Sequence, residues 1–161
     1  MSQPEIVETA INAPYWSALR QGRLDYQHCR SCGHDWLPAR AHCPACLDTD
    51  NEWRAASGSG RLVSWVVYHR AYAPHLAARL PYNVAIVELA EGPRLLTSIV
   101  DRPDGSGLFA DAAVALRIEE DFGRPLPRFC LSQQALTAAR AAEYFRTPRR
   151  PQDAIEERSE Q

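Results

Sequence analysis

The stretch that decides the fold is CRSCG at residues 29–33, followed by CPAC at residues 43–46. Only two residues separate the cysteines of each pair, so one tight turn can aim both sulfurs at the same ion. Two such turns facing each other create a tetrahedral four-sulfur site, which is typical of structural zinc. The predicted ligands of one metal ion are Cys29, Cys32, Cys43 and Cys46.

Zinc is the favoured ion, and iron is the alternative, because the same kind of turns holds rubredoxin-type iron. The nearby His28, His34 and His42 are not needed as ligands, since four thiolates already complete the shell. Disulfides are disfavoured because we expect a cytoplasmic protein. Four protein ligands leave no open position for a substrate, so the metal is expected to stabilise the fold and not to catalyse.

The composition is that of a globular protein, with 45% hydrophobic residues, 24% charged residues and a formal net charge of −2. All 18 basic residues are arginine, which excludes chemistry that depends on a lysine amine. Positive and negative residues balance along most of the chain, which disfavours nucleic acid as a partner. The sequence has no apolar run of ~18 residues and no signal-peptide pattern at its start, so we expect no membrane partner and a cytoplasmic location.

Composition divides the chain into four expected segments. Residues 1–12 are expected to form a flexible arm. Residues 13–56 combine a short helix, predicted from Ala13 to Gln21, with the cysteine-rich stretch, which is too polar to fold without its ion. Residues 57–131 carry a β pattern, and residues 132–161 are expected to form a C-terminal extension, helical at first and then disordered.

The β pattern consists of five runs rich in β-branched and aromatic residues. These runs cover residues 62–68, 82–89, 94–100, 112–119 and 128–131. The turn Glu91-Gly92-Pro93 predicts that the second and third runs form a hairpin, and residues 71–81 suit a loop or a short helix. The predicted fold class is therefore mostly β, with a five-stranded OB-fold barrel after the ribbon. A five-stranded meander and an SH3-like barrel fit the same pattern.

The motifs around the cysteines also resemble a known family. The residues that carry the resemblance are Tyr15-Trp16, Gly22-Arg23-Leu24, Gln27, the four cysteines, Gly33, Pro44, Trp53, Ser57-Gly58, Gly60, Pro81-Tyr82, Val87-Glu88-Leu89 and Glu91-Gly92-Pro93-Arg94-Leu95. They resemble the OB-fold proteins with an N-terminal rubredoxin-like zinc ribbon, a family long filed as a domain of unknown function and associated with acyl-CoA enzymes. One departure is Leu47, which replaces the glycine that commonly follows the last cysteine of a rubredoxin-like turn.

The resemblance implies a non-catalytic accessory subunit with structural zinc. Members of the family accompany thiolase-superfamily catalytic subunits, namely thiolases, thiolase-like aldolases and acyltransferases. Others accompany enoyl-CoA hydratases of the hot-dog fold. In such complexes the OB domain is thought to shape the acyl-CoA site while the ribbon docks on the partner. The resemblance therefore implies that the partner supplies the catalytic residues and that this chain has none.

Candidate contacts to CoA lie at the ends of the predicted strands. They are Tyr68, His69, Arg70, Tyr82 and Arg94. Arginine suits the phosphates of CoA, and the face of a tyrosine ring suits adenine.

Two other functions stay open on the sequence alone. Trp36 and Trp53 lie on either side of the second cysteine pair, where packing under the metal loop or between ribbon and barrel is the default interpretation, and stacking on the bases of a single-stranded nucleic acid is the alternative. The unpaired Cys130 could act as a nucleophile, although a free cysteine in an apolar strand is usually a small buried hydrophobe.

Overall fold

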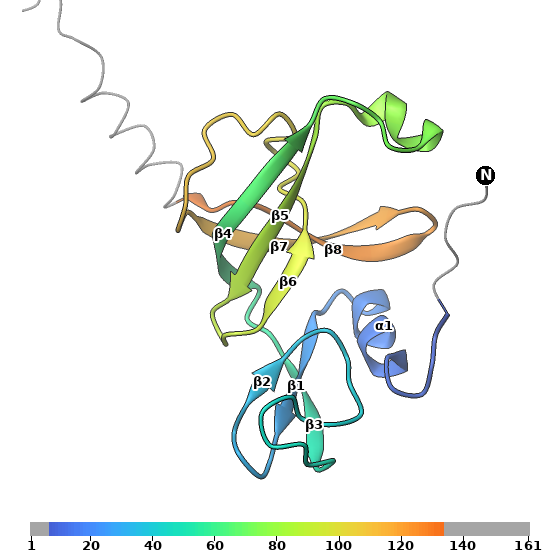
Figure 1. Ribbon diagram of the computed structural model, residues 1–161, viewed down its shortest axis with the longest axis vertical. Helices are drawn as coiled ribbons and strands as arrows, with labels where there is room; N and C mark the ends of the chain where they lie inside the picture. The colour runs from blue at the N-terminus through green and yellow to red at the C-terminus, as the bar shows by residue number, and fades with distance from the viewer. Residues whose placement is uncertain (1–6, 134–161) are drawn as a thin grey trace, which may run out of the picture.

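The computed structural model describes residues 7–133 and contains one short helix and two β-sheets (Figure 1). The elements are α1 (Ala13–Arg20), β1 (Asp25–Cys29), β2 (Asp35–Trp36), β3 (Asn51–Ala55), β4 (Ser59–Tyr68), the 3-10 helix η1 (Pro74–Arg79), β5 (Tyr82–Leu89), β6 (Arg94–Thr97), β7 (Ala113–Asp121) and β8 (Arg124–Leu131). The ribbon, which comprises α1 to β3, lies below the larger sheet in this view.

Helix α1 forms where the sequence predicts it. Pro14 lies in the first turn, where its missing N–H costs no helical hydrogen bond. Trp16 and Leu19 are buried against the rest of the protein, and Gly22 ends the turn with a φ of 77°. The helix therefore holds its place mainly through its apolar face, because eight residues are too few for an independent helix.

Strands β1, β2 and β3 form a small antiparallel sheet in the order β2-β1-β3. Its own buried cluster is limited to Cys29, Trp36 and Cys43. Such a small apolar cluster stabilises a fold only weakly, so this part of the chain depends on other bonds.

The larger sheet has the order β6-β5-β4-β7-β8, with every neighbouring pair antiparallel. Strand β4 pairs with both β5 and β7, which rules out the simple meander. The sheet curls into a half-barrel whose two edges approach each other. There the Thr97 hydroxyl donates to the Pro127 carbonyl oxygen at 2.7 Å, and Ile99 bridges Phe129 in parallel. The predicted strands and the predicted hairpin of β5 and β6 are confirmed.

Three strands extend beyond the predicted runs, namely β4, β7 and β8, whereas β6 ends at Thr97 although its run was predicted to continue to Val100. Strand β4 starts at Ser59, since Gly60 lets two backbones approach closely: a Cβ at this position would lie 2.7 Å from the Glu88 carbonyl oxygen. Strand β8 starts at Arg124 although it contains Pro125 and Pro127. Proline is tolerated there because β8 is an edge strand, where alternate N–H groups have no partner in the sheet.

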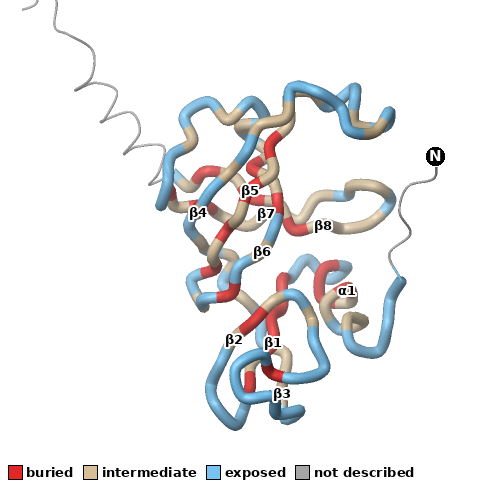
Figure 2. The backbone as a smooth tube through the Cα atoms, viewed as in Figure 1, coloured by how far each residue is buried: buried red, intermediate tan, exposed pale blue. Residues whose placement is uncertain are grey.

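One apolar core joins the half-barrel to the helix. Leu62, Val87 and Phe129 are completely buried at its centre, and Trp16 and Leu19 of α1 belong to the same cluster. Figure 2 shows buried positions at intervals along the strands of the larger sheet and on α1. This shared core fixes the ribbon and the half-barrel relative to each other.

Parts of the predicted organisation lie outside the described residues. These are most of the C-terminal extension (132–161) and the first half of the N-terminal arm (1–12). Within residues 7–133, no helix has the length and apolar character needed to span a membrane.

Candidate metal centre and ligand surface

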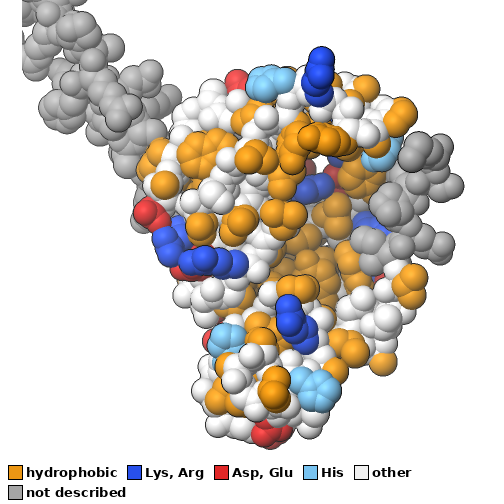
Figure 3. Space-filling view, in the orientation of Figure 1, with side chains coloured by type: hydrophobic (Ala, Val, Ile, Leu, Met, Phe, Trp, Pro, Cys, Tyr) orange, Lys and Arg blue, Asp and Glu red, His pale blue; other side chains and the backbone are white. Residues whose placement is uncertain are grey.

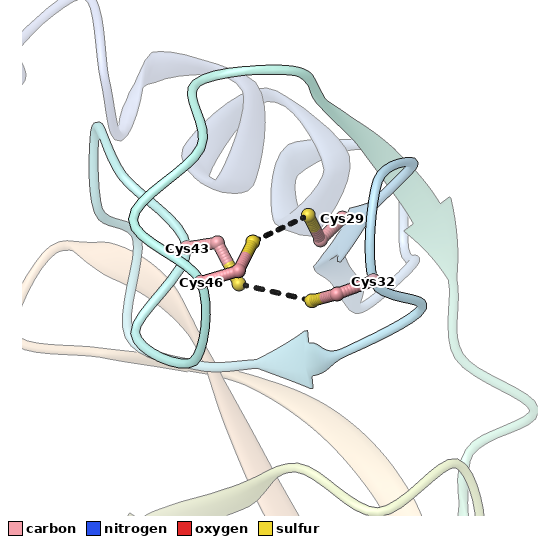
Figure 4. A group of neighbouring side chains, drawn as sticks. All are labelled: Cys29, Cys32, Cys43 and Cys46. Carbon is pink, nitrogen blue, oxygen red and sulfur yellow. Dashed lines mark hydrogen bonds between the residues drawn. The ribbon is translucent and has the colours of Figure 1, made fainter.

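The four cysteines of the predicted metal site come together at the tip of the ribbon (Figure 4). Cys29 and Cys32 lie at the β1–β2 turn, and Cys43 and Cys46 lie in the β2–β3 loop. The sulfurs of Cys29 and Cys46 are 3.5 Å apart, those of Cys32 and Cys43 are 3.6 Å apart, and all four lie within 4.8 Å of one another. A tetrahedral zinc ion with four Zn–S bonds requires about 3.8 Å between sulfurs. The donor set and its spacing therefore fit such an ion.

The two cysteine turns have matching backbone geometry. The Gly33 N–H donates to the Cys29 carbonyl oxygen, and the Leu47 N–H donates to the Cys43 carbonyl oxygen, both at 2.9 Å. The residues that close the turns have left-handed backbones, with φ of 75° at Gly33 and 66° at Leu47. Leu47 therefore occupies a conformation that glycine adopts without strain and leucine does not.

Replacing Leu47 by glycine is expected to keep the metal site and to raise the free energy of unfolding by about 0.5–1 kcal/mol. The Leu47 side chain is 74% exposed, so its loss removes little packing. The opposite substitution, Gly33→Ala in the first turn, is the control and is expected to lower the free energy of unfolding by a similar amount. The added Cβ would meet no atom within 4 Å, so the cost comes from the left-handed backbone at residue 33, which alanine disfavours. Urea unfolding of both variants measures the difference. A destabilised Leu47→Gly variant would contradict the argument.

The environment of Cys43 favours a thiolate, whereas neighbouring thiols raise the pKa of Cys32 and Cys46 in the absence of an ion. Cys29 and Cys43 are buried, whereas Cys32 and Cys46 are exposed. Burial opposes ionisation of the Cys43 thiol, but the backbone N–H groups of Cys46 and Ala45 outweigh it and lower its pKa to about 7. The Ala45 N–H lies 3.4 Å from the Cys43 sulfur. A sulfur that accepts backbone hydrogen bonds is a good anionic ligand.

The histidines beside the cysteines do not join this cluster in the described part of the chain. His28 Nδ1 lies 2.6 Å from Asp35 Oδ1, and His34 stacks on Trp36 with ring centres 6.1 Å apart. These two imidazoles are thus engaged within the ribbon.

Four of the five candidate CoA contacts gather at one end of the β4–β5 pair. Tyr68 and Tyr82 face each other across the two strands and stack, with ring centres 5.0 Å apart and an angle of 17° between the planes. His69 and Arg70 follow directly and are exposed. Tyr72, which the sequence analysis missed, packs edge-on against Tyr68 at 5.4 Å. Tyr72 lies in the loop after β4, where spacing in the sequence does not indicate which side chains meet.

Arg94, the fifth candidate, lies elsewhere. Its Nε is 2.6 Å from a carboxylate oxygen of Glu88, which also binds Arg61. Glu88 is six residues from Tyr82 along β5, a separation of about 20 Å in an extended strand. The structure does not place Arg94 with the tyrosines.

A second feature missed by sequence is an arginine–aspartate cluster near the tyrosines. Asp121 accepts hydrogen bonds from Arg79 of η1 at 2.8 and 2.5 Å and from Arg128 of β8 at 2.5 Å. The Arg79 guanidinium also lies 4.3 Å from the centre of the Phe122 ring. These contacts tie η1 to the β7–β8 hairpin beside a polar cavity of about 390 Å³. No sequence pattern links Arg79 to Asp121, which lies 42 residues away in the chain.

Cys130, the alternative nucleophile, lies in β8 and is half-buried. Its sulfur donates to the Ala115 carbonyl oxygen at 3.7 Å. Among residues 7–133, no imidazole is hydrogen-bonded to this sulfur. Its surroundings are those of a packed strand residue.

Family models match both parts of the chain. The rubredoxin-like zinc ribbon domain of ChsH2 matches residues 16–52, and the C-terminal OB-fold domain of ChsH2 matches residues 53–119. The four cysteines fall within the first match, which supports a bound metal at this site.

Relatives with curated names match part of the chain. A Thermomonospora curvata protein named "Probable enoyl-CoA hydratase alpha subunit" is 40% identical over 55% of this chain and 27% of its own length. A Methanocaldococcus jannaschii "DUF35 domain-containing scaffold protein" is 34% identical over 60% of this chain and 64% of its own length. A Pyrococcus furiosus protein of the same name is 32% identical over 54% of this chain and 63% of its own length. The chain thus spans less than two thirds of these relatives.

Two solved structures share the fold. A chain of the "Ltp2-ChsH2(DUF35) aldolase" is 34% identical, with a TM-score of 0.67, over 80% of this chain and 98% of that chain. A Sulfolobus solfataricus DUF35 protein of unknown function is 13% identical, with a TM-score of 0.57, over 76% of this chain and 86% of its own, and shows the likeness of fold alone. The predicted family resemblance and the predicted ribbon and OB-fold are confirmed. This chain belongs to the ChsH2 (DUF35) family, which joins a rubredoxin-like zinc ribbon to an OB-fold domain.

Proposed function

We propose that this protein is a non-catalytic accessory subunit of a thiolase-type acyl-CoA enzyme, such as a thiolase, a thiolase-like aldolase or an acyltransferase. It docks on the catalytic subunit and shapes the acyl-CoA site. The observation that carries the proposal is the 34% identity to a chain of the Ltp2-ChsH2(DUF35) aldolase over 98% of that chain. The name "scaffold protein" of two archaeal relatives supports a role in assembly.

The metal in this proposal is zinc with a purely structural role, held by the four cysteine sulfurs. Four thiolates fill a tetrahedral shell, so the ion offers no open position for a substrate or water. What zinc supplies is a cross-link between the β1–β2 turn and the β2–β3 loop. The residues that this chain contributes to the complex therefore act by binding and positioning.

The proposed contact with CoA is the stacked pair of Tyr68 and Tyr82 together with His69 and Arg70. The paired rings form an aromatic surface that suits the face of adenine, and a guanidinium suits a phosphate. Arg94 is a weaker candidate, because its charge is already balanced by Glu88. These assignments concern an acyl-CoA bound between this chain and its partner.

A second candidate is an accessory role beside an enoyl-CoA hydratase, including one of the hot-dog fold. It is favoured by the Thermomonospora curvata relative, whose name contains that activity and whose length extends far beyond the matched part. Both candidates share an acyl-CoA substrate and differ in the catalytic partner. Single-strand binding has less support, since the net charge of −2 provides no electrostatic attraction to phosphates.

The test is to recover the tagged chain from its native cells and to identify proteins bound in stoichiometric amount. We expect a thiolase-fold enzyme, with turnover of acyl-CoA by the complex and none by the isolated chain. A bound hydratase would favour the second candidate. Robust turnover by the isolated chain, or recovery of nucleic acid in place of an enzyme, would contradict the accessory role.

A further inference from the structure

Strand β6 forms an open edge of the half-barrel next to a hollow. In Figure 3 the face between the ribbon and the half-barrel is hollowed, and hydrophobic side chains gather in the hollow. A groove of about 410 Å³ lies between β6, helix α1 and the loop after β2. We call it the β6 groove.

The walls of the β6 groove are mostly apolar and come from three separate elements. They include Tyr15 and Trp16 of α1, Leu37 and Pro38 of the loop, and Leu95 and Leu96 of β6. The side chain of Leu96 is 72% exposed at the edge of this groove. Such a site has the size and lining that accept an apolar side chain from another molecule.

Backbone groups of β6 point outward beside the groove. Strand β6 pairs only with β5 within the described sheet, and the Ser98 carbonyl oxygen accepts from the Phe129 N–H, away from β5. In an antiparallel strand, alternate residues direct both backbone groups to the same side. Leu96 and Arg94 therefore direct their N–H and C=O groups the same way as Ser98. At these two positions the edge is free to pair with another strand.

The charges around the β6 groove favour an acidic occupant. The Arg124 guanidinium lies 5.6 Å from the centre of the Trp16 ring, which lines the groove. Within residues 7–133, Arg124 has no carboxylate oxygen within 4.0 Å. The nearby acid Glu8 is already paired with Arg20 at 2.8 Å. The rim therefore carries a positive charge at Arg124 without an ion-pair partner in the described residues.

We propose that the β6 groove is a docking site for an extended segment of the catalytic partner, one that carries an apolar side chain flanked by acidic residues. The segment pairs with the outward edge of β6 at Leu96, inserts its apolar side chain between β6 and α1, and places its acidic residues on the side of Arg124. Backbone pairing gives affinity, while the groove and the charges select the segment. This inference rests on the proposed accessory function.

Photo-cross-linking tests which chain occupies the groove. p-Benzoylphenylalanine replaces Leu96 in the full chain, which is expressed with the partner identified by recovery from native cells. The control places the same group at Val66 on β4, an exposed apolar position outside the groove. We expect position 96, and not position 66, to cross-link to one partner segment that contains an apolar residue with acids beside it.

A backbone variant tests the pairing itself. Leu96→Pro removes the leucine side chain and the outward N–H; that N–H makes no bond to β5, and proline is tolerated at a free sheet edge. Leu96→Ala keeps the N–H and removes the side chain. We expect Leu96→Pro to weaken partner binding about tenfold relative to Leu96→Ala, with equal thermal midpoints for both variants.

The outcomes separate this inference from the proposed function. If the complex forms but position 96 cross-links to residues 134–161 of the same chain, to a second copy, or to nothing, the docking site is wrong and the accessory role stands. Equal partner affinity of the proline and alanine variants would also overturn the pairing. If no catalytic partner binds at all, both proposals fail.

Discussion

Replacing Cys43 by serine is expected to release the metal ion and to unfold the ribbon. Cys43 is completely buried, its sulfur lies 3.6 Å from that of Cys32, and the cluster found in residues 7–133 holds no fifth candidate ligand. Apart from the core shared with the half-barrel, the ribbon has a separate buried cluster of three residues, two of which are predicted ligands. Metal binding in such modules contributes on the order of 10 kcal/mol to folding. Atomic emission should give one zinc per native chain and almost none in the variant.

The matched control for this prediction is Cys130→Ser, which changes a cysteine outside the cluster. It is expected to keep one zinc per chain and, in the reconstituted complex, full activity. Loss of activity in Cys130→Ser with zinc retained would instead support a nucleophilic role for that sulfur. A Cys43→Ser protein with stoichiometric zinc and an unchanged thermal midpoint would contradict the four-sulfur site. Iron in place of zinc would be visible from its absorbance and would correct the identity of the ion.

Replacing Asp121 by asparagine is expected to lower the free energy of unfolding by about 2 kcal/mol. The substitution keeps the shape of the side chain but removes the charge shared by Arg79 and Arg128. The side chains of Asp121 and Arg128 are only 12% and 17% exposed, so the uncompensated guanidinium is poorly solvated. Urea unfolding at neutral pH measures the change, and hydrogen exchange should show faster opening of η1.

The control is Asp111→Asn, which removes a carboxylate that is 70% exposed and paired with Arg61. Exposed ion pairs contribute little, so we expect a change below about 0.5 kcal/mol. Equal effects of the two substitutions would show that the Asp121 cluster has no special role.

The effect of Asp121→Asn should also depend on pH. Hydrogen bonds from Arg79, opposed by burial and reinforced by Arg128, hold the pKa of Asp121 below its ordinary value of 3.8. Because the pKa of Asp121 is lower in the folded than in the unfolded protein, the ionised carboxylate stabilises the fold at any pH above the ordinary value. This stabilisation disappears as the pH falls through the folded-state pKa. The stability difference between the two proteins should therefore be constant above about pH 5 and shrink below about pH 4. A difference that grows on acidification would contradict this assignment.

The sequence predicted the local features well. The cysteine spacing indicated the four-sulfur cluster, and the runs of β-branched residues indicated all five strands of the half-barrel. The cysteine turns and the strands each depend on residues that are close in the chain, so residue spacing and the alternation of side chains are enough to predict them. The first residues of β4 and β8 were missed, because glycine and proline usually interrupt a strand. In β4 the close approach of the neighbouring backbone explains Gly60, and in β8 the edge position explains the two prolines.

The division between sequence and tertiary structure follows from the range of the interactions. By itself the sequence determined the four-cysteine cluster, the short helix and the β character of the barrel, because local geometry and side-chain periodicity encode them. Only the tertiary structure decided that β4 pairs with β7, that Asp121 joins η1 to the β7–β8 hairpin, and that β6 faces α1 across a groove. These contacts join residues distant in the chain, and they arise only when burial of the common core selects one arrangement of the strands.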